Sequence, residues 1–231
     1  MSMPGSGPRS APVARISRSA ITANARAARA RGVHSFSPSV FEADAWGHGA
    51  VLIREVLAAE GFVPVDAPTT LVLTTGAHAA PDRPQTPVSA RELFGLEPGT
   101  TPALRLTGTV LSVKDLRAGE GVSYGYLYRA SSDTRLALVT GGYAQGIVRA
   151  LGGAVDVAIA GERHPIIGRV AMDVCVVEIR DAVVQRGDEV LVLGDPAAGE
   201  PSLADWVRAT GLFPAELITT VGLRSIREEA P

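Results

Sequence analysis

Lysine is nearly absent from this sequence of 231 residues: among 22 basic residues, only Lys114 is a lysine and the others are arginines. Arginine stays protonated in proteins and forms no Schiff base, so lysine-dependent covalent chemistry has a single candidate donor. Cysteine is equally scarce, and because Cys175 has no partner an internal disulfide is excluded. Cys175 lies in an alternating apolar stretch, which predicts a small buried core residue.

The sequence also lacks a basic excess, a long apolar run and a metal-ligand pattern. A formal net charge of −2 makes nucleic acid a poor partner, and no apolar run reaches the ~18 residues of a membrane span. His34, His78 and His164 have no cysteine or second histidine at ligand spacing, so no metal site is predicted. Residues 1–12 are rich in Gly, Ser and Pro and predict a flexible tail, not a signal peptide. We therefore expect a cytoplasmic protein that binds a small molecule.

The N-terminal region is predicted to contain two βα units over residues 13–62. The expected elements are a strand at 13–17, a helix at 19–30, a strand at 38–44 and a helix at 49–61. Ser17 or Ser19 is the candidate N-cap of the first helix, and Gly61 ends the second. Residues 63–100 are rich in proline and predict a connection that holds one strand at 69–75 and a short helix at 89–95.

From residue 101 onward, short apolar strands alternate with turn signals. The expected strands lie at 103–116, 121–130, 134–143, 155–161, 162–179 and 188–195. Regular short strands of this kind predict a small antiparallel β-barrel or sandwich. A helix at 202–211, capped by Ser202, and a closing segment follow. The predicted fold class is α+β, with a β-domain over residues 101–231 behind a short α/β part.

Four separated stretches of the C-terminal half resemble the β-domain of alanine racemases, in the family's order and spacing. They are AGEGVSYG, GGYAQGIVRAL, the PIIGRVAMD run and QRGDEVLVLG, and the resemblance extends over about residues 100–227. Near the N-terminus, FEADAWGHG resembles the V-V-K-A-D-A-Y-G-H-G motif of the family's first barrel strand. The resemblance implies an alanine-racemase-type β-barrel that carries a short remnant of the (β/α)8 barrel. It also implies a homodimer, in which the β-domain of a second subunit completes each site.

The resemblance assigns roles to residues of the β-domain. Tyr124, in GVSYG, matches the catalytic tyrosine of the family. Tyr143 matches the second tyrosine motif, and Arg149 and Arg169 match residues at the substrate entry. Met172 matches a residue whose backbone N–H holds the substrate carboxylate. Asp173 follows in an otherwise apolar strand, so we expect it either to contact a ligand or to pair internally with Arg169 or a turn amide.

The departures from the family concern its pyridoxal phosphate cofactor. Glu42 occupies the position of the lysine that carries the cofactor, while Trp46 and Leu223 replace two tyrosines that contact its phosphate. A full barrel needs roughly 200–250 residues, far more than precede the β-domain here. Lys114 matches a strand lysine that in the family is remote from the cofactor. We therefore expect neither pyridoxal phosphate nor another cofactor.

Glu42 is the residue on which the functional hypothesis depends. On the predicted strand it shares a face with Asp44, and a carboxylate partly removed from water suits general acid–base catalysis. His48 and Trp46 would lie beside it, with His48 bonded to the turn backbone. We predict that Glu42 and Tyr124 form an acid–base pair across a dimer.

Two functions follow from these residues, and the sequence leaves both open. The first is a PLP-independent enzyme that isomerises, cyclises or eliminates from a small metabolite in natural-product biosynthesis. The second is a non-catalytic binding protein in which Glu42 is an exposed remnant and the β-domain serves dimerisation.

Overall fold

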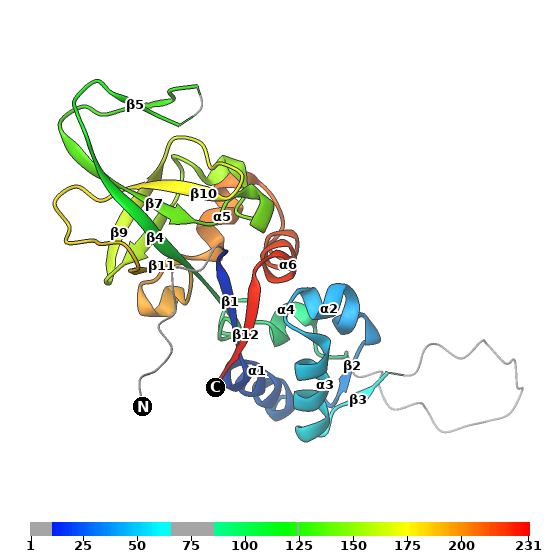
Figure 1. Cartoon of the computed structure of the whole chain (residues 1–231). Helices are drawn as coiled ribbons and strands as arrows, with labels where there is room; N and C mark the ends of the chain where they lie inside the picture. Colours follow the sequence, from blue (N-terminus) through cyan, green and yellow to red (C-terminus); the bar gives the residue numbers. More distant parts are fainter. Residues whose placement is uncertain (1–10, 66–85, 124) are drawn as a thin grey trace, which may run out of the picture.

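The computed structural model describes residues 11–65, 86–123 and 125–231 of the chain (Figure 1). Residues 1–10 of the predicted tail, the strand predicted at 69–75 and Tyr124 lie outside the described residues.

Six antiparallel strands close into the predicted β-barrel. They are β4 (Leu104–Leu116), β7 (Thr134–Thr140), β8 (Asp156–Ile159), β9 (Glu162–Ile167), β10 (Val174–Glu178) and β11 (Glu189–Leu193). The order around the barrel is β11-β8-β9-β10-β7-β4, and β4 pairs again with β11. Alternate residues such as Val139, Val157 and Val177 are fully buried, as a filled small barrel requires. The α+β fold and its antiparallel barrel are confirmed.

Two of the expected strands divide into shorter pieces. Where one strand is expected at 121–130, the structure has β5 (Gly121–Val122) and β6 (Tyr128–Arg129), which pair as a hairpin and form a separate two-stranded sheet. In Figure 1 this hairpin projects beyond the barrel at the far end of β4. Residues 162–179 form β9 and β10, which are joined by a turn over residues 168–173. Both interruptions fall on glycine-containing stretches that carry candidate site residues.

The strands near the two ends of the chain extend the barrel sheet. β1 (Val13–Ser17) pairs antiparallel with β4 and parallel with β12 (Ile226–Ala230). The strand predicted at 13–17 is therefore correct, but its hydrogen bonds lie with the β-domain. Ser17 accepts a hydrogen bond from the N–H of Ala20, which caps the helix that follows.

Besides the turn of α2 (Glu42–Trp46) described below, three helices and a short parallel pairing form the described N-terminal part. The helices are α1 (Arg18–Ala30), α3 (Ala50–Ala59) and α4 (Ala90–Leu93). β2 (Ser35–Phe36) pairs parallel with β3 (Val63–Pro64), and Phe36 also bridges to Val88. The core of this part is continuous with the barrel core, since the same buried cluster includes Ile53, Phe94 and Val139.

The strand predicted at 38–44 is wrong. A 3-10 turn, η1 (Pro38–Phe41), is followed by the single-turn element α2 (Glu42–Trp46). Ser37 caps η1 and Pro38 occupies its first turn, where the missing N–H of proline needs no partner, so a helical turn forms in place of a strand. Ala43 to Trp46 then adopt left-handed conformations with φ between 48° and 55°. Glu42 and Asp44 therefore do not share the face of a strand.

Two C-terminal helices complete the fold. α5 (Leu203–Thr210) is capped by Ser202 as predicted, and α6 (Pro214–Arg224) follows it. Short 3-10 turns lie at η2 (Tyr143–Gln145), η3 (Arg149–Leu151) and η4 (Pro196–Ala198). In Figure 1, α6 lies between the barrel and the helices of the N-terminal part. Of the helices in the described residues, none combines the length and the apolar character needed to cross a bilayer.

Candidate functional site

The β-domain candidates lie on two turns that are locked together by backbone hydrogen bonds. The N–H of Tyr143 donates to the carbonyl of Ala171 at 3.0 Å, and the N–H of Ala144 donates to that of Met172 at 2.9 Å. Gly142 lies so close to this second turn that a Cβ on it would be 2.3 Å from the carbonyl oxygen of Met172. Gly152, which ends η3, also lies against this second turn, since a Cβ on it would overlap the carbonyl oxygen of Gly168. The turns of η2 and η3 and the turn over residues 168–173 therefore form one surface, which we call the β-face.

The β-face presents its side chains to the outside. Tyr143 is 39% exposed and Met172 is 56% exposed, and the guanidinium of Arg149 lies 5.7 Å from the centre of the Tyr143 ring. Arg149 and Arg169 are both exposed. Among the described residues, no acceptor bonds to the N–H of Met172. An aromatic ring, two cations and a free amide donor thus lie on fixed backbone, which suits recognition of a small anionic or carboxylate-bearing molecule.

Asp173 is not buried, contrary to the expectation from its apolar neighbours. It precedes β10 in a bend and is exposed, because the strand begins only at Val174. Its carboxylate accepts a hydrogen bond from the side-chain amide of Gln145 at 3.0 Å. Among the described ion pairs, none joins Asp173 to Arg169. Asp173 therefore ties the two turns of the β-face together.

A cavity of about 400 Å³ lies where the β5–β6 hairpin meets the β-face. Ser123 makes two hydrogen bonds to the backbone of Arg169, donating to its carbonyl at 2.9 Å and accepting from its N–H at 3.0 Å. The remaining lining residues are Gly125, Tyr126, Ala171, Val174 and Val176. Residues on both sides of Tyr124 in the chain therefore border this cavity.

The second group of candidates surrounds α2. Asp44 caps α3, since its Oδ1 accepts from the N–H of Ala50 at 2.7 Å, and its Oδ2 lies 2.7 Å from the guanidinium of Arg227. The hydrogen bond from Ala50 and the charge of Arg227 lower the pKa of the Asp44 carboxyl. Glu42 is exposed and has no hydrogen bond or ion pair within the described residues. The partly desolvated Glu42 expected from the sequence is therefore not found in the single chain.

Trp46 and His48 pack on the ring of Phe94. The Trp46 ring meets it edge-on with centroids 5.7 Å apart, and the fully buried His48 ring stacks on it at 4.2 Å. Nδ1 of His48 lies 3.0 Å from the carbonyl of Ala45, so Nδ1 carries the proton. Burial lowers the pKa of His48 to about 4. In the single chain His48 therefore has the structural role of bonding the turn backbone.

The buried His48 predicts a loss of stability in mild acid. Because its folded-state pKa of about 4 lies below the ordinary value of 6.5, the unfolded chain binds a proton first. The stabilising effect is complete above the unfolded pKa and decreases as the pH falls from 6.5 toward 4, by about 3 kcal/mol in total. Urea unfolding should show about 2 kcal/mol lower stability at pH 5 than at pH 7. In His48→Gln this difference should be smaller, and an unchanged difference would assign the effect to other groups.

Helix α6 separates the two groups of candidates within one chain. A Cβ on Gly47 would be 2.7 Å from Cα of Gly222, and one on Gly146 would be 3.0 Å from the carbonyl carbon of Thr220. Thr220 and Gly222 are two residues apart on α6, which places them about 200° apart around its axis. The turn of α2 and the turn of η2 therefore pack against roughly opposite sides of the same helix.

The residues present do not fit pyridoxal phosphate. Glu42 stands where a lysine would carry the cofactor, and Lys114 is exposed on β4. Leu104, the first residue of β4, pairs with Ile16. Ile16 lines a cavity together with His48, which follows α2, so this end of β4 lies near α2. Lys114 lies ten residues further along β4 than Leu104, which at about 3.3 Å per residue is roughly 33 Å. The only lysine of the chain is therefore far from α2.

We predict that the protein forms no Schiff base with pyridoxal phosphate at α2. Incubation with the cofactor, reduction with borohydride and peptide mass spectrometry should give no adduct apart from slow labelling of Lys114 and of the α-amino group, which also condenses with aldehydes. Lys114→Arg should abolish the labelling at position 114. An adduct that saturates at one equivalent and is accompanied by alanine racemisation would contradict the prediction.

Several residues of these groups were missed at the level of sequence. Phe94, Gly222 and Arg227 hold the α2 turn in place, yet they are separated from it by 46 residues or more along the chain. The one local signal was Gly222, a glycine inside an apolar helical pattern, which is typical of close packing. Ser123, which fixes the hairpin to Arg169, gave no local signal.

The comparisons with known proteins identify the family of the β-domain. A model of the alanine racemase C-terminal domain matches residues 103–229, more than half of the chain. The alanine racemases of Mycobacterium leprae and Thermobifida fusca are 41% identical over 144 residues and 42% identical over 127 residues. These matches cover 58% and 55% of this chain, but only 37% and 34% of those enzymes. The chain thus spans little more than a third of the length of these curated relatives.

Solved structures support the fold. The crystal structure of alanine racemase from D-cycloserine producing Streptomyces lavendulae matches with a TM-score of 0.80 and 22% identity, over 98% of each chain. Alanine racemase from Clostridium difficile 630, in complex with cycloserine, matches with a TM-score of 0.55 and 28% identity, over 60% of this chain and 38% of that one. Because the family model matches more than half of the chain and the barrel agrees with these structures, the chain belongs to the alanine racemase family through its C-terminal β-domain.

Proposed function

We propose that this protein is a PLP-independent enzyme that acts as a homodimer and catalyses a proton-transfer reaction on a small metabolite. The reaction class is isomerisation, cyclisation or elimination, in a specialised biosynthetic pathway. The observation that carries the proposal is the β-face. Tyr143, Arg149 and Met172 are held outward on hydrogen-bonded turns although the cofactor lysine is absent.

The β-face restricts which residues the chain can carry and adds little to the stability of the fold. This combination favours a functional role. Gly142 must be glycine, because a Cβ there would overlap the backbone of the opposite turn. Exposed apolar side chains such as Met172, and unpaired guanidinium groups, contribute little to the stability of the fold. A chain selected only for folding would not need this arrangement, whereas a binding pocket would.

The proposal needs two copies of the chain. Because α6 lies between the α2 turn and the η2 turn, one chain does not present both groups to one small substrate. Exposed apolar side chains lie on α6, at Leu223 (50% exposed), and just before α6, at Phe213 (74% exposed). A twofold interface formed by two copies of the chain would bury these side chains. A second copy would bring its β-face and Tyr124 toward α2 of the first.

The chemistry follows from the side chains that such an interface would unite. Arg149, Arg169 and the free N–H of Met172 would hold a substrate carboxylate. Glu42, freed from water by the partner surface, would remove a proton, and the Tyr124 phenol would donate one on the other face of the substrate. Both groups act by proton transfer alone, so the mechanism requires no covalent intermediate.

A second candidate function is binding without catalysis. The exposed position of Glu42 favours it, since an exposed carboxylate without a hydrogen-bond partner is also what drift after loss of the lysine would leave. In this case the β-face would bind a ligand or a partner, and neither Glu42 nor Tyr124 would affect turnover.

An assay that does not require a known substrate distinguishes the enzyme from the non-catalytic binding protein. The protein is incubated in D2O with a metabolite extract, and mass spectrometry detects any metabolite that gains deuterium or changes composition. The enzyme proposal expects at least one such metabolite with the wild-type protein and none with Glu42→Gln. If wild type and variant leave the extract equally unchanged, with several extracts, the binding function replaces the enzyme proposal.

A further inference from the structure

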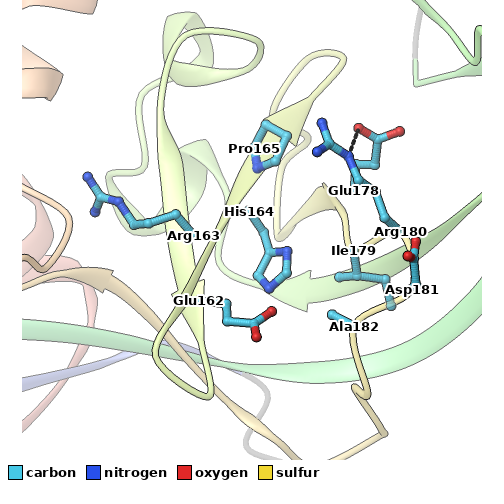
Figure 2. Close-up of a pocket in the computed structure, with 9 residues that line it drawn as sticks. All are labelled: Glu162, Arg163, His164, Pro165, Glu178, Ile179, Arg180, Asp181 and Ala182. Atoms are coloured by element: carbon cyan, nitrogen blue, oxygen red, sulfur yellow. Dashed lines mark ion pairs between the residues drawn. The ribbon is translucent and has the colours of Figure 1, made fainter.

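A second cavity, remote from the β-face, opens where β9 and β10 part (Figure 2). The two strands pair only at Val176 with Ile167 and at Val177 with Ile166. The next residue of β9 is Pro165, which has no N–H to continue the ladder. On its other edge β10 stays paired with β7, since the N–H of Ile179 donates to the carbonyl of Arg135 in β7 at 2.9 Å. The strands therefore diverge and leave a cavity of about 400 Å³.

His164 supplies an unpaired polar atom in this cavity. The residue is only 6% exposed, and its Nε2 is buried without a hydrogen-bond partner among the described residues. Figure 2 shows its ring between the two walls, which are β9 on one side and residues 178–182 on the other. An unpaired buried nitrogen costs about 1–3 kcal/mol and calls for a ligand or an ordered water. An imidazole with its proton on Nδ1 offers Nε2 as an acceptor.

The charged groups of the cavity divide into paired and unpaired sets. Glu178 accepts a hydrogen bond from the Tyr128 hydroxyl at 2.6 Å and lies 3.6 Å from Arg180. Arg163 lies 3.9 Å from Asp205, outside the cavity. Glu162 and Asp181 are exposed and have no partner in the described part of the chain.

The unpaired groups of this cavity are therefore two carboxylates and a buried imidazole nitrogen. In Figure 2 Glu162 lies on the β9 wall and Asp181 on the opposite wall. This set lacks a free cation and favours a positively charged ligand with hydrogen-bond donors. A metal ion is disfavoured, because no cluster of three or more His, Cys, Asp or Glu side chains in the described residues has metal-binding geometry. An organic ammonium fits these groups better than a metal ion does, because it donates three hydrogen bonds and does not need several ligand atoms at coordination distance.

We propose that this cavity binds a small aliphatic diamine. One ammonium pairs with Glu162, the other pairs with Asp181 across the cavity, and the first also donates to Nε2 of His164. The carbon chain between them lies along Ile179 and Ala182, which line the same cavity. The site uses neither Glu42 nor the β-face and does not depend on the function proposed above.

NMR titration of the full-length protein with 1,4-diaminobutane tests the site, with the His164 side-chain resonances assigned through its backbone. We expect saturable shifts of His164 on adding the diamine and none on adding propionate at equal ionic strength. Glu162→Gln and Asp181→Asn should each weaken binding about three- to tenfold, since both are exposed, charge-assisted contacts. Asp115→Asn is the matched control, because Asp115 is an exposed carboxylate on β4 outside the cavity and should leave binding unchanged.

Three results would overturn the proposal. If the His164 resonances do not shift when the diamine is added, the diamine does not contact the imidazole, and an ordered water is the partner of Nε2. Equal affinity in the double variant of Glu162 and Asp181 would mean that the amine is only adsorbed to the surface. Shifts caused by Zn²⁺ but not by the diamine would identify a metal site instead.

Discussion

Replacing Gly47 by alanine should destabilise the protein by about 2–5 kcal/mol, as the sum of a backbone term and a packing term. Gly47 has a φ of +80°, a conformation that costs an L-residue about 1–2 kcal/mol. Its Cβ would also be 2.7 Å from Cα and 2.8 Å from the carbonyl carbon of Gly222, which are backbone atoms of α6 and do not rotate away. Urea unfolding of wild type and variant measures the difference.

Two matched variants separate these terms. Gly153 has the same φ of +80°, but a Cβ there meets nothing within 4 Å, so Gly153→Ala should cost only the backbone term of about 1–2 kcal/mol. Gly222 is helical, and alanine would ordinarily stabilise a helix by about 1 kcal/mol. Gly222→Ala should nevertheless destabilise, because its Cβ would be 2.7 Å from the carbonyl oxygen of Gly47. Equal losses in Gly47→Ala and Gly153→Ala would show that α2 does not pack tightly on α6.

Glu42→Gln and Tyr124→Phe should each lower the rate of the reaction by about 10²–10⁴-fold, the usual contribution of a positioned acid or base. Both substitutions keep the size of the side chain and remove only the group that exchanges a proton. The rate of deuterium incorporation into the metabolite identified in D2O measures the effect. Glu42 has no partner in the described chain, so Glu42→Gln should leave the urea midpoint unchanged.

Asp115→Asn serves as a control for the loss of one surface carboxylate and should retain full activity. A rate within twofold of wild type in both Glu42→Gln and Tyr124→Phe would exclude the acid–base pair. In that case a different group on the β-face would have to carry the reaction, or the protein would bind without catalysis.

The barrel was predictable because its strands follow a local rule. Short apolar stretches over 103–116, 134–143 and 188–195 are separated by turn signals, and the structure places the strands β4, β7 and β11 within them. The caps were also predictable, since Ser17 and Ser202 act on amides three residues away. The strands and the caps depend on residues that are close together in the sequence, so the sequence alone is enough to predict them.

The α2 turn was not predictable by the same rules. Three of its four left-handed residues are alanine and tryptophan, types with no preference for that conformation, and their backbone is held by contacts to Gly222, Phe94 and Arg227. The pairing of β1 with β4 and β12 is likewise long-range. The burial predicted for Asp173 was wrong for a related reason. The apolar residues on both sides of it do not show that the strand begins only at Val174. The family resemblance located the site residues, but only the fold shows that α6 separates them.

The most direct test of the account is a cross-link between two copies of the chain. Glu42→Cys protein is mixed with Tyr124→Cys protein, subunits are allowed to exchange, and a short bismaleimide is added; native Cys175 is 1% exposed and should not react. A site shared between two subunits predicts a covalent dimer in the mixture and not in either variant alone. A mixture of Glu42→Cys with Val183→Cys, whose side chain is 94% exposed, controls for random collision. A stable monomer by light scattering, or no cross-link above that control, would contradict a shared site.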